Sequence, residues 1–206
     1  MHLDRKFFKK KIILITPSFA GGGAEFITVN LSNYFFSKKY KILLICFKKE
    51  GPFLKELNKN IEIININSFK KLVIIKRLIK ILIRHPKSIV FSTVRASNLL
   101  LGISMYFLDN SLYKTIFREA TTFSGELEIK LLKRIFRRLL FQIAYFKSNL
   151  IIANSNDVKH QIRERILIPR DIIKISNPAL RVNQRDLRRA SINHKWIINK
   201  KFKILL

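Results

Sequence analysis

A short apolar run near the start of the chain is followed by three consecutive glycines and then by a helical pattern. The run Ile-Ile-Leu-Ile spans residues 12–15, the glycines are Gly21, Gly22 and Gly23, and the expected helix starts at residue 24. This order is typical of α/β domains that bind nucleotides or phosphates, because glycine lets a ligand approach the backbone and a helix N-terminus attracts anions. The spacing matches neither the dinucleotide-binding motif nor the P-loop, so a plain turn without a ligand is the alternative.

Strand and helix patterns alternate through the rest of the chain. The strand patterns are continuous apolar runs, which are typical of strands covered on both faces, and such strands form parallel sheets. The sequence therefore predicts an α/β fold: a doubly wound, Rossmann-like, mostly parallel sheet of six or seven strands with helices on both faces. The expected strands are residues 11–16, 40–47, 61–66, 88–92, 112–117, 150–153 and 172–175, and the expected helices are residues 24–37, 53–58, 70–84, 96–108, 125–147 and 156–168.

The chain is strongly basic, with 41 Lys and Arg against 13 Asp and Glu and a formal net charge of +28. Such a charge indicates an anionic partner: a phosphorylated substrate, a membrane surface or nucleic acid. An AT-rich genome, which inflates Lys usage, is the competing explanation. Nucleic acid is the least favoured partner, because the sequence shows no recognisable binding module and the Phe residues fall mainly in strands and on apolar helix faces.

Cysteine and histidine positions limit the chemistry of the chain. The only cysteine, Cys46, lies in an apolar run and is expected in the core, and a disulfide within the chain is impossible. The four histidines are far apart, so we expect no metal site. No uncharged run approaches the ~18 residues needed to span a bilayer.

Two expected helices, residues 70–84 and 125–147, carry basic residues on one side and apolar residues on the other, with no acidic residues interleaved among the basic ones. The ordinary interpretation is an apolar side against the core and a solvated basic side. The alternative is a surface that attracts anionic headgroups, which predicts a cytoplasmic protein peripheral on the inner face of the cytoplasmic membrane. The basic positions are Lys70, Lys76, Arg77, Lys80 and Arg84 in the first helix and Lys130, Lys133, Arg134, Arg137 and Arg138 in the second.

Five segments in order along the chain resemble the N-terminal half of glycosyltransferase family 4, whose members have the two-domain GT-B fold. They are the G-G-A-E loop at residues 22–25 with the N-L segment at 30–31, residues 90–98, the R-E pair at 118–119, the A-N-S segment at 153–155 and the I-S-N-P segment at 175–178. The resemblance implies that residues 1–180 form the acceptor-side domain. Residues 181–206 would be the interdomain linker and the start of the first strand of a C-terminal donor domain that is otherwise missing.

The same resemblance implies a retaining, metal-independent glycosyltransferase without a cofactor. It would move a hexose or N-acetylhexosamine from a UDP- or GDP-sugar, bound mainly by the missing domain, to a lipid-linked or polysaccharide acceptor. Alone the chain would be inactive. It would be a truncated product, a split half whose donor domain is a separate chain, or a non-catalytic remnant.

Candidate substrate- and phosphate-binding residues follow three of the expected strands. Gly21, Gly22 and Gly23 with Glu25 would face the interdomain cleft, although Glu25 at a helix start also favours the helix dipole on its own.

The other candidates lie further along the chain. Arg118 is a candidate to bind a phosphate, with a buried ion pair to Glu119 as the alternative. Arg95 and Asn98 open a helix and are candidates for acceptor hydroxyls or phosphate, with a surface cap as the alternative. No residue stands out as a nucleophile or base.

Overall fold

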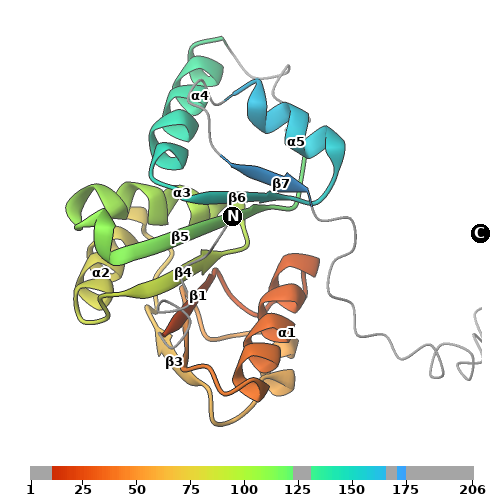
Figure 1. The fold of residues 1–206 in the computed structure, drawn as a ribbon, viewed down its shortest axis with the longest axis vertical. Coiled ribbons are helices and arrows are strands. Elements are labelled where there is room, and N and C mark those ends of the chain that lie inside the picture. Colours follow the sequence, from red (N-terminus) through yellow and green to blue (C-terminus); the bar gives the residue numbers. More distant parts are fainter. Residues whose placement is uncertain (1–10, 123–130, 166–170, 175–206) are drawn as a thin grey trace, which may run out of the picture.

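The structure, a computed structural model, describes residues 11–122, 131–165 and 171–174. It contains a seven-stranded sheet with the order β3-β2-β1-β4-β5-β6-β7, in which every neighbouring pair is parallel (Figure 1). This confirms the predicted doubly wound α/β sheet. The strands are β1 (Ile12–Thr16), β2 (Ile42–Cys46), β3 (Glu62–Asn65), β4 (Ser88–Ser92), β5 (Tyr113–Glu119), β6 (Leu150–Ala153) and β7 (Ile172–Lys174).

Burial along the strands follows their place in the sheet. Every residue of β1 and of β2 is buried, as expected for strands covered on both faces, whereas β3 at one edge of the sheet has no fully buried residue. Cys46 ends β2 and is completely buried, which confirms its predicted place in the core.

The helices divide between the two faces of the sheet. Helix α1 packs on one face through Val29, and helices α2 to α5 pack on the other. This division follows from right-handed crossovers, because the chain moves outward from β1 in one direction to β3 and then returns to build β4 to β7 in the other. The bounds are α1 (Gly23–Ser37), η2 (Pro52–Glu56), α2 (Lys71–Ile83), α3 (Arg95–Ser104), η3 (Met105–Phe107), η4 (Asn110–Leu112), α4 (Leu131–Phe146) and α5 (Asn156–Arg163).

Several expected boundaries differ from the structure. Strand β5 runs on to Glu119, so the Arg118 and Glu119 pair belongs to the strand itself. Helix α3 ends at Ser104 and continues as the 3-10 turn η3, and α5 ends at Arg163 instead of residue 168. The expected linker and strand within residues 181–206 lie outside the described residues.

The two amphipathic helices behave differently. In α2 the apolar residues Ile74, Leu78 and Leu82 are buried, so the expectation that the apolar side of this helix faces the core is confirmed there. In α4 this interpretation is wrong. The apolar side of α4 is largely exposed, and its core contacts come from the opposite side through Phe141 and Tyr145. An amphipathic pattern fixes two sides of a helix but does not say which side meets the core.

Two close backbone approaches hold the site region together. Gly51 has φ +120°, and a Cβ there would collide with the carbonyl of Phe19, so the loop after β2 lies directly against the loop after β1. The amide N–H of Phe19 donates to the Glu50 carbonyl at 2.8 Å. Gly102 in α3 faces the backbone of Ala144 in α4, where a Cβ would also collide.

Candidate functional site

The strand order reverses between β1 and β4, and in open parallel sheets ligands bind at the carboxyl ends of strands at such a reversal. The glycine loop follows β1, Arg95 begins α3 just after β4, and Arg118 and Glu119 end β5. The structure therefore brings all of the sequence-predicted residues to one edge of the sheet.

The glycine loop is exposed at this edge. Gly21 has φ +109°, a conformation that favours glycine, and Gly22 caps α1 without a side-chain hydrogen bond. The space beside Gly23 is open, since a Cβ there would meet no atom within 4 Å. The Glu25 carboxylate folds back beside Gly22, which fits the interpretation that Glu25 favours the dipole of α1.

Glu119 is completely buried and lies at the centre of a polar network. Its carboxylate accepts hydrogen bonds from Arg95 Nε at 2.9 Å, from Asn98 Nδ2 at 3.1 Å and from the Tyr145 hydroxyl. Arg95 also donates to the carbonyl of Thr121 at 2.7 Å and so ties the segment after β5 to α3.

This network corrects two alternatives drawn from the sequence. The ion-pair partner of Glu119 is Arg95, not Arg118, because successive residues of a strand point to opposite faces of the sheet. Asn98 is completely buried and bonds to Glu119, so it is not a surface cap.

Tyr145 is a member of the network that sequence reasoning missed. Burial and the neighbouring Glu119 carboxylate raise the pKa of Tyr145 well above its ordinary value, so its hydroxyl keeps the proton that it donates. Nothing in the apolar pattern of α4 distinguishes Tyr145 from the other aromatic residues there.

Arg118 has a different environment from Glu119. Phe117 packs with the α2 to α5 cluster and Ile116 packs with the α1 cluster, so alternation places Arg118 on the α1 face. Phe117 pairs with Ser92, and continuing this register sets Arg118 beside Thr93. The Thr93 hydroxyl lies 2.6 Å from the Thr28 hydroxyl in the second turn of α1. Arg118 therefore shares its face and its edge of the sheet with the start of α1.

The Arg118 guanidinium is nearly buried, with 7% of the residue exposed, and its Nη1 has no hydrogen-bond partner in the described part of the chain. Burial lowers the pKa of Arg118, and the charge of Glu119 partly opposes this shift. A buried donor without an acceptor is costly, so this group has the character of a site for an anion.

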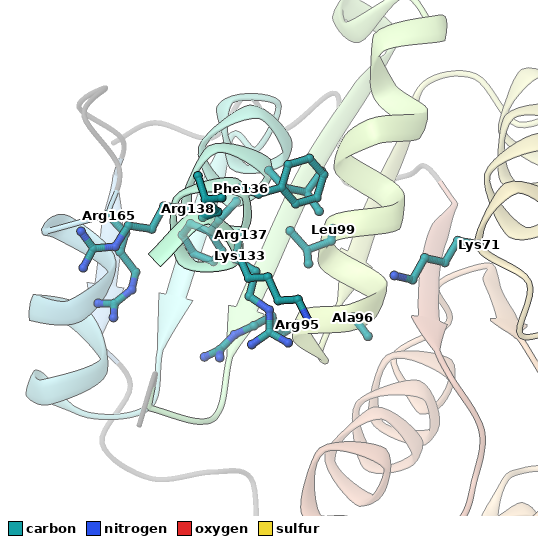
Figure 2. A pocket seen from close by; sticks show the side chains of 12 residues that line it. Lys71, Arg95, Ala96, Leu99, Lys133, Phe136, Arg137, Arg138 and Arg165 are labelled. Carbon is teal, nitrogen blue, oxygen red and sulfur yellow. The ribbon is translucent and has the colours of Figure 1, made fainter. Parts of the chain in front are cut away.

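A pocket of about 810 Å³ lies on the other face, between α3 and α4 (Figure 2). Six of its lining residues are basic and six are apolar, and no acidic residue of the described chain lines it. Its character suits a ligand that combines an anionic group with an apolar part. The lining residues are Lys71, Arg95, Ala96, Leu99, Leu132, Lys133, Phe136, Arg137, Arg138, Leu140, Phe141 and Arg165.

Sequence reasoning found Arg95 and the basic side of α4 but did not join them into one pocket. Within residues 11–122, 131–165 and 171–174, no group of three or more His, Cys, Asp or Glu side chains is placed to hold a metal ion. No helix in this part of the chain is both long and apolar enough to cross a bilayer.

Neither a protein-family model nor a curated protein matches the sequence. Solved structures do match the fold. One is Anabaena HepE in complex with UDP, which is 14% identical with a TM-score of 0.57 over 81% of this chain and 43% of that chain. Another is a glycosyltransferase from Rickettsia africae, which is 22% identical with a TM-score of 0.56 over 81% of this chain and 42% of that chain. The apo form of WaaB, a lipopolysaccharide outer core galactosyltransferase, also matches. It is 16% identical with a TM-score of 0.54 over 79% of this chain and 44% of that chain.

These identities are low, so the likeness concerns the fold. The chain spans less than half the length of each of these proteins. The sheet of this chain has the fold of a GT-B half-domain, and two of the three similar structures are glycosyltransferases.

Proposed function

We propose that the chain is the acceptor-side half of a retaining, metal-independent glycosyltransferase of family 4. It takes part in moving a hexose or N-acetylhexosamine from a UDP- or GDP-sugar to a lipid-linked or polysaccharide acceptor. The observation that carries the proposal is the half GT-B sheet with cationic groups gathered at its carboxyl edge. The complex of HepE with UDP supports a sugar nucleotide as one substrate.

Arg118 is the residue to which we assign a substrate phosphate. Its buried, unpartnered Nη1 requires an acceptor, and a phosphate oxygen satisfies both the charge and the hydrogen bond. The exposed backbone at Gly23 and the start of α1 lie on the same face and favour the same anionic charge. Sugar nucleotides and lipid-linked sugars both carry such phosphates.

The pocket beside α4 is assigned to the acceptor. A lipid-linked acceptor has a phosphate or diphosphate next to an apolar chain, and the pocket offers Lys133 and Arg137 beside Leu132 and Phe136. Its volume of about 810 Å³ is in the range of small-molecule sites.

Glu119 and Asn98 receive a positioning role, because both are completely buried. Glu119 holds Arg95 in the lining of the pocket, and Arg95 in turn donates to the carbonyl of Thr121. Their effect on a substrate passes through Arg95.

Transfer requires the second half of the fold, which we expect in a separate chain or in a longer form of this protein. The test mixes this chain with a chain that carries the donor domain, a panel of UDP- and GDP-hexoses, and lipid-linked acceptors, and measures sugar incorporation. We expect transfer only when both halves are present, with a loss of about tenfold or more for Arg118→Gln.

The matched control is Arg84→Gln, which removes an exposed arginine at the end of α2. It should leave transfer unchanged. Absence of transfer with every donor and acceptor would contradict the proposal and favour a non-catalytic remnant. Tight, steeply salt-dependent binding to DNA without transfer would favour a nucleic-acid-binding protein.

A further inference from the structure

The outward side of α4 carries a stripe of apolar side chains that the described chain leaves uncovered. Leu132 is 81% exposed, Phe136 is 65% exposed and Leu139 is 56% exposed. At 100° per residue these positions and four others fall within a ~140° arc. The outer stripe of α4 consists of Leu131, Leu132, Ile135, Phe136, Leu139, Ile143 and Phe146.

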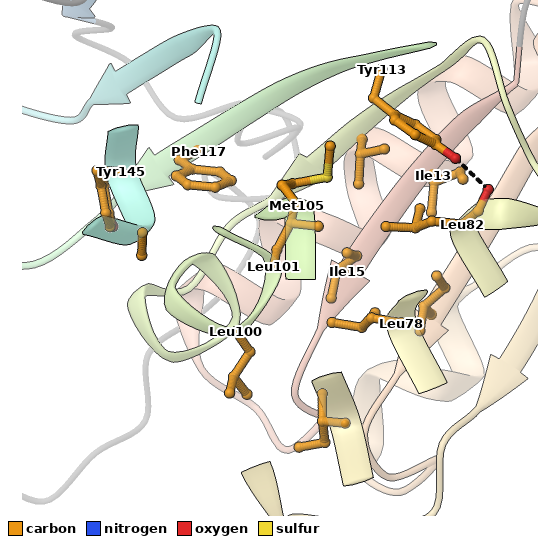
Figure 3. Packing of buried hydrophobic residues seen from close by; sticks show 14 of the residues in the cluster. Ile13, Ile15, Leu78, Leu82, Leu100, Leu101, Met105, Tyr113, Phe117 and Tyr145 are labelled. Carbon is orange, nitrogen blue, oxygen red and sulfur yellow. Dashed lines mark hydrogen bonds between the residues drawn. The ribbon is translucent and has the colours of Figure 1, made fainter. Parts of the chain in front are cut away.

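The orientation of α4 is fixed from its other side. Tyr145 is completely buried and packs edge-on against Phe117 of β5, with ring centroids 5.1 Å apart (Figure 3). It also stacks on Phe141 of its own helix, with ring centroids 3.8 Å apart. Gly102 brings the backbone of α3 against Ala144. With these contacts made, the outer stripe points away from the core, and rotating the helix to bury the stripe would break them.

An exposed apolar stripe of this size marks an interaction surface, because monomeric soluble proteins rarely leave such a patch open. Two basic residues border the stripe on the helix surface, and no acidic residue occurs between Leu131 and Phe146. Association with a second copy is disfavoured, since it would bring two chains of net charge +28 together through the same cationic helix. The charge instead complements an anionic surface. The bordering residues are Lys133 and Arg138, whereas Arg134 and Arg137 lie on the opposite side of the helix.

We propose that the outer stripe of α4 lies in the interface of a bilayer that contains anionic lipids. The helix would rest in the membrane plane with its apolar residues among the upper acyl chains and with Lys133 and Arg138 among the headgroups. At ~1.5 Å per residue, the described 16 residues of α4 are too short to span a bilayer, so the contact is peripheral.

The end of the stripe has the composition of a membrane interface. The Tyr106 hydroxyl, from η3, donates to the Ile143 carbonyl at 2.9 Å, and the Tyr106 side chain is half exposed. The Lys147 ammonium lies 4.4 Å from the Tyr106 ring centroid. Tyrosine and lysine suit this level, because each has an apolar body and a polar end.

This inference does not depend on the proposed sugar transfer, but it would serve it. Leu132 and Phe136 belong both to the outer stripe and to the wall of the cationic pocket. A helix seated in the interface would therefore open the pocket at the level of lipid headgroups.

The test is flotation of the full chain with vesicles of phosphatidylcholine alone or mixed with phosphatidylglycerol. We expect binding to the mixed vesicles, weaker binding to phosphatidylcholine, and a loss of about tenfold or more for the double variant Leu132→Ser and Phe136→Ser. Ile83→Ser is the matched control, because Ile83 is 60% exposed at the end of α2 and lies outside the stripe. Removing one bordering charge by Arg138→Gln should weaken binding about fivefold.

A second measurement guards against misfolding of the serine variant. Phe136→Trp should show a blue shift of tryptophan emission on mixed vesicles and none on addition of DNA or a soluble protein. Equal flotation of the wild type and the serine variant would overturn the proposal. Absence of flotation of the wild type would also overturn the proposal. A concentration-dependent dimer that the serine variant abolishes would overturn it as well and would assign the stripe to a second copy. Sugar transfer to a soluble acceptor is measured with the wild-type chain and needs no bilayer, so failure of the membrane contact would not contradict the proposed function.

Discussion

Replacing Arg118 by methionine should make the protein more stable and less able to bind anions. The Nη1 donor of Arg118 is buried without a hydrogen-bond partner in the described chain, and such a donor costs about 1–3 kcal/mol. Methionine keeps an unbranched stem of similar reach but removes the unsatisfied group. We therefore expect Arg118→Met to raise the free energy of unfolding by about 1–3 kcal/mol in buffer without polyvalent anions.

Pyrophosphate should change this comparison. At a concentration of about 100 times its dissociation constant, a ligand stabilises the folded state by about 2.7 kcal/mol. The wild type should gain that amount and the variant should gain little, so the advantage of the variant disappears or reverses. Urea denaturation with and without pyrophosphate measures both effects.

The control is Arg84→Met, which removes an exposed arginine and should change stability by no more than ~0.5 kcal/mol in either buffer. The reasoning would be refuted if Arg118→Met destabilised the chain by more than ~1 kcal/mol without ligand, because Arg118 would then be a satisfied structural residue. Equal stabilisation of the wild type and the variant by pyrophosphate would refute the assignment of the phosphate to Arg118.

Three further predictions concern the scaffold. Glu119→Ala removes a completely buried carboxylate that pairs with Arg95, so it should lower the free energy of unfolding, measured by urea denaturation, by about 3–5 kcal/mol. Glu62→Ala, at an exposed ion pair, should lower it by no more than ~1 kcal/mol. Gly102→Ala should overpack the contact between α3 and α4 and cost about 1–3 kcal/mol, and a melting temperature unchanged from the wild type would contradict that contact. Burial raises the pKa of Cys46 to about 11, so at pH 8 the thiol should resist alkylation in the native protein and react at once in denaturant.

Most of the fold follows from patterns that the sequence displays directly. Continuous apolar runs such as the one in β1 identified buried parallel strands, and the order of strands and helices then gave the doubly wound sheet. The sheet in turn brings Gly21, Arg95 and Arg118 to one edge, because the carboxyl ends of parallel strands meet there.

The partners of the candidate residues were harder to predict. The strand period already places Arg118 and Glu119 on opposite faces, so the alternative of an ion pair between them could have been excluded from the sequence. The contact of Glu119 with Tyr145 could not be predicted, because it joins residues 26 positions apart that no local sequence pattern relates. The outward orientation of α4 was also beyond the sequence, since it depends on the close approach at Gly102.

The central claim is that the carboxyl edge of this half-sheet binds the phosphates of sugar carriers. Titrating the isotope-labelled chain with decyl phosphate, below the concentration at which it forms micelles, and following backbone amide shifts tests this most directly. The account predicts saturable shifts at the glycine loop, at Arg95 and at the residues of α4 that line the pocket. Shifts confined to the opposite edge, for example around Lys87 before β4, or no saturable shifts at all, would contradict it.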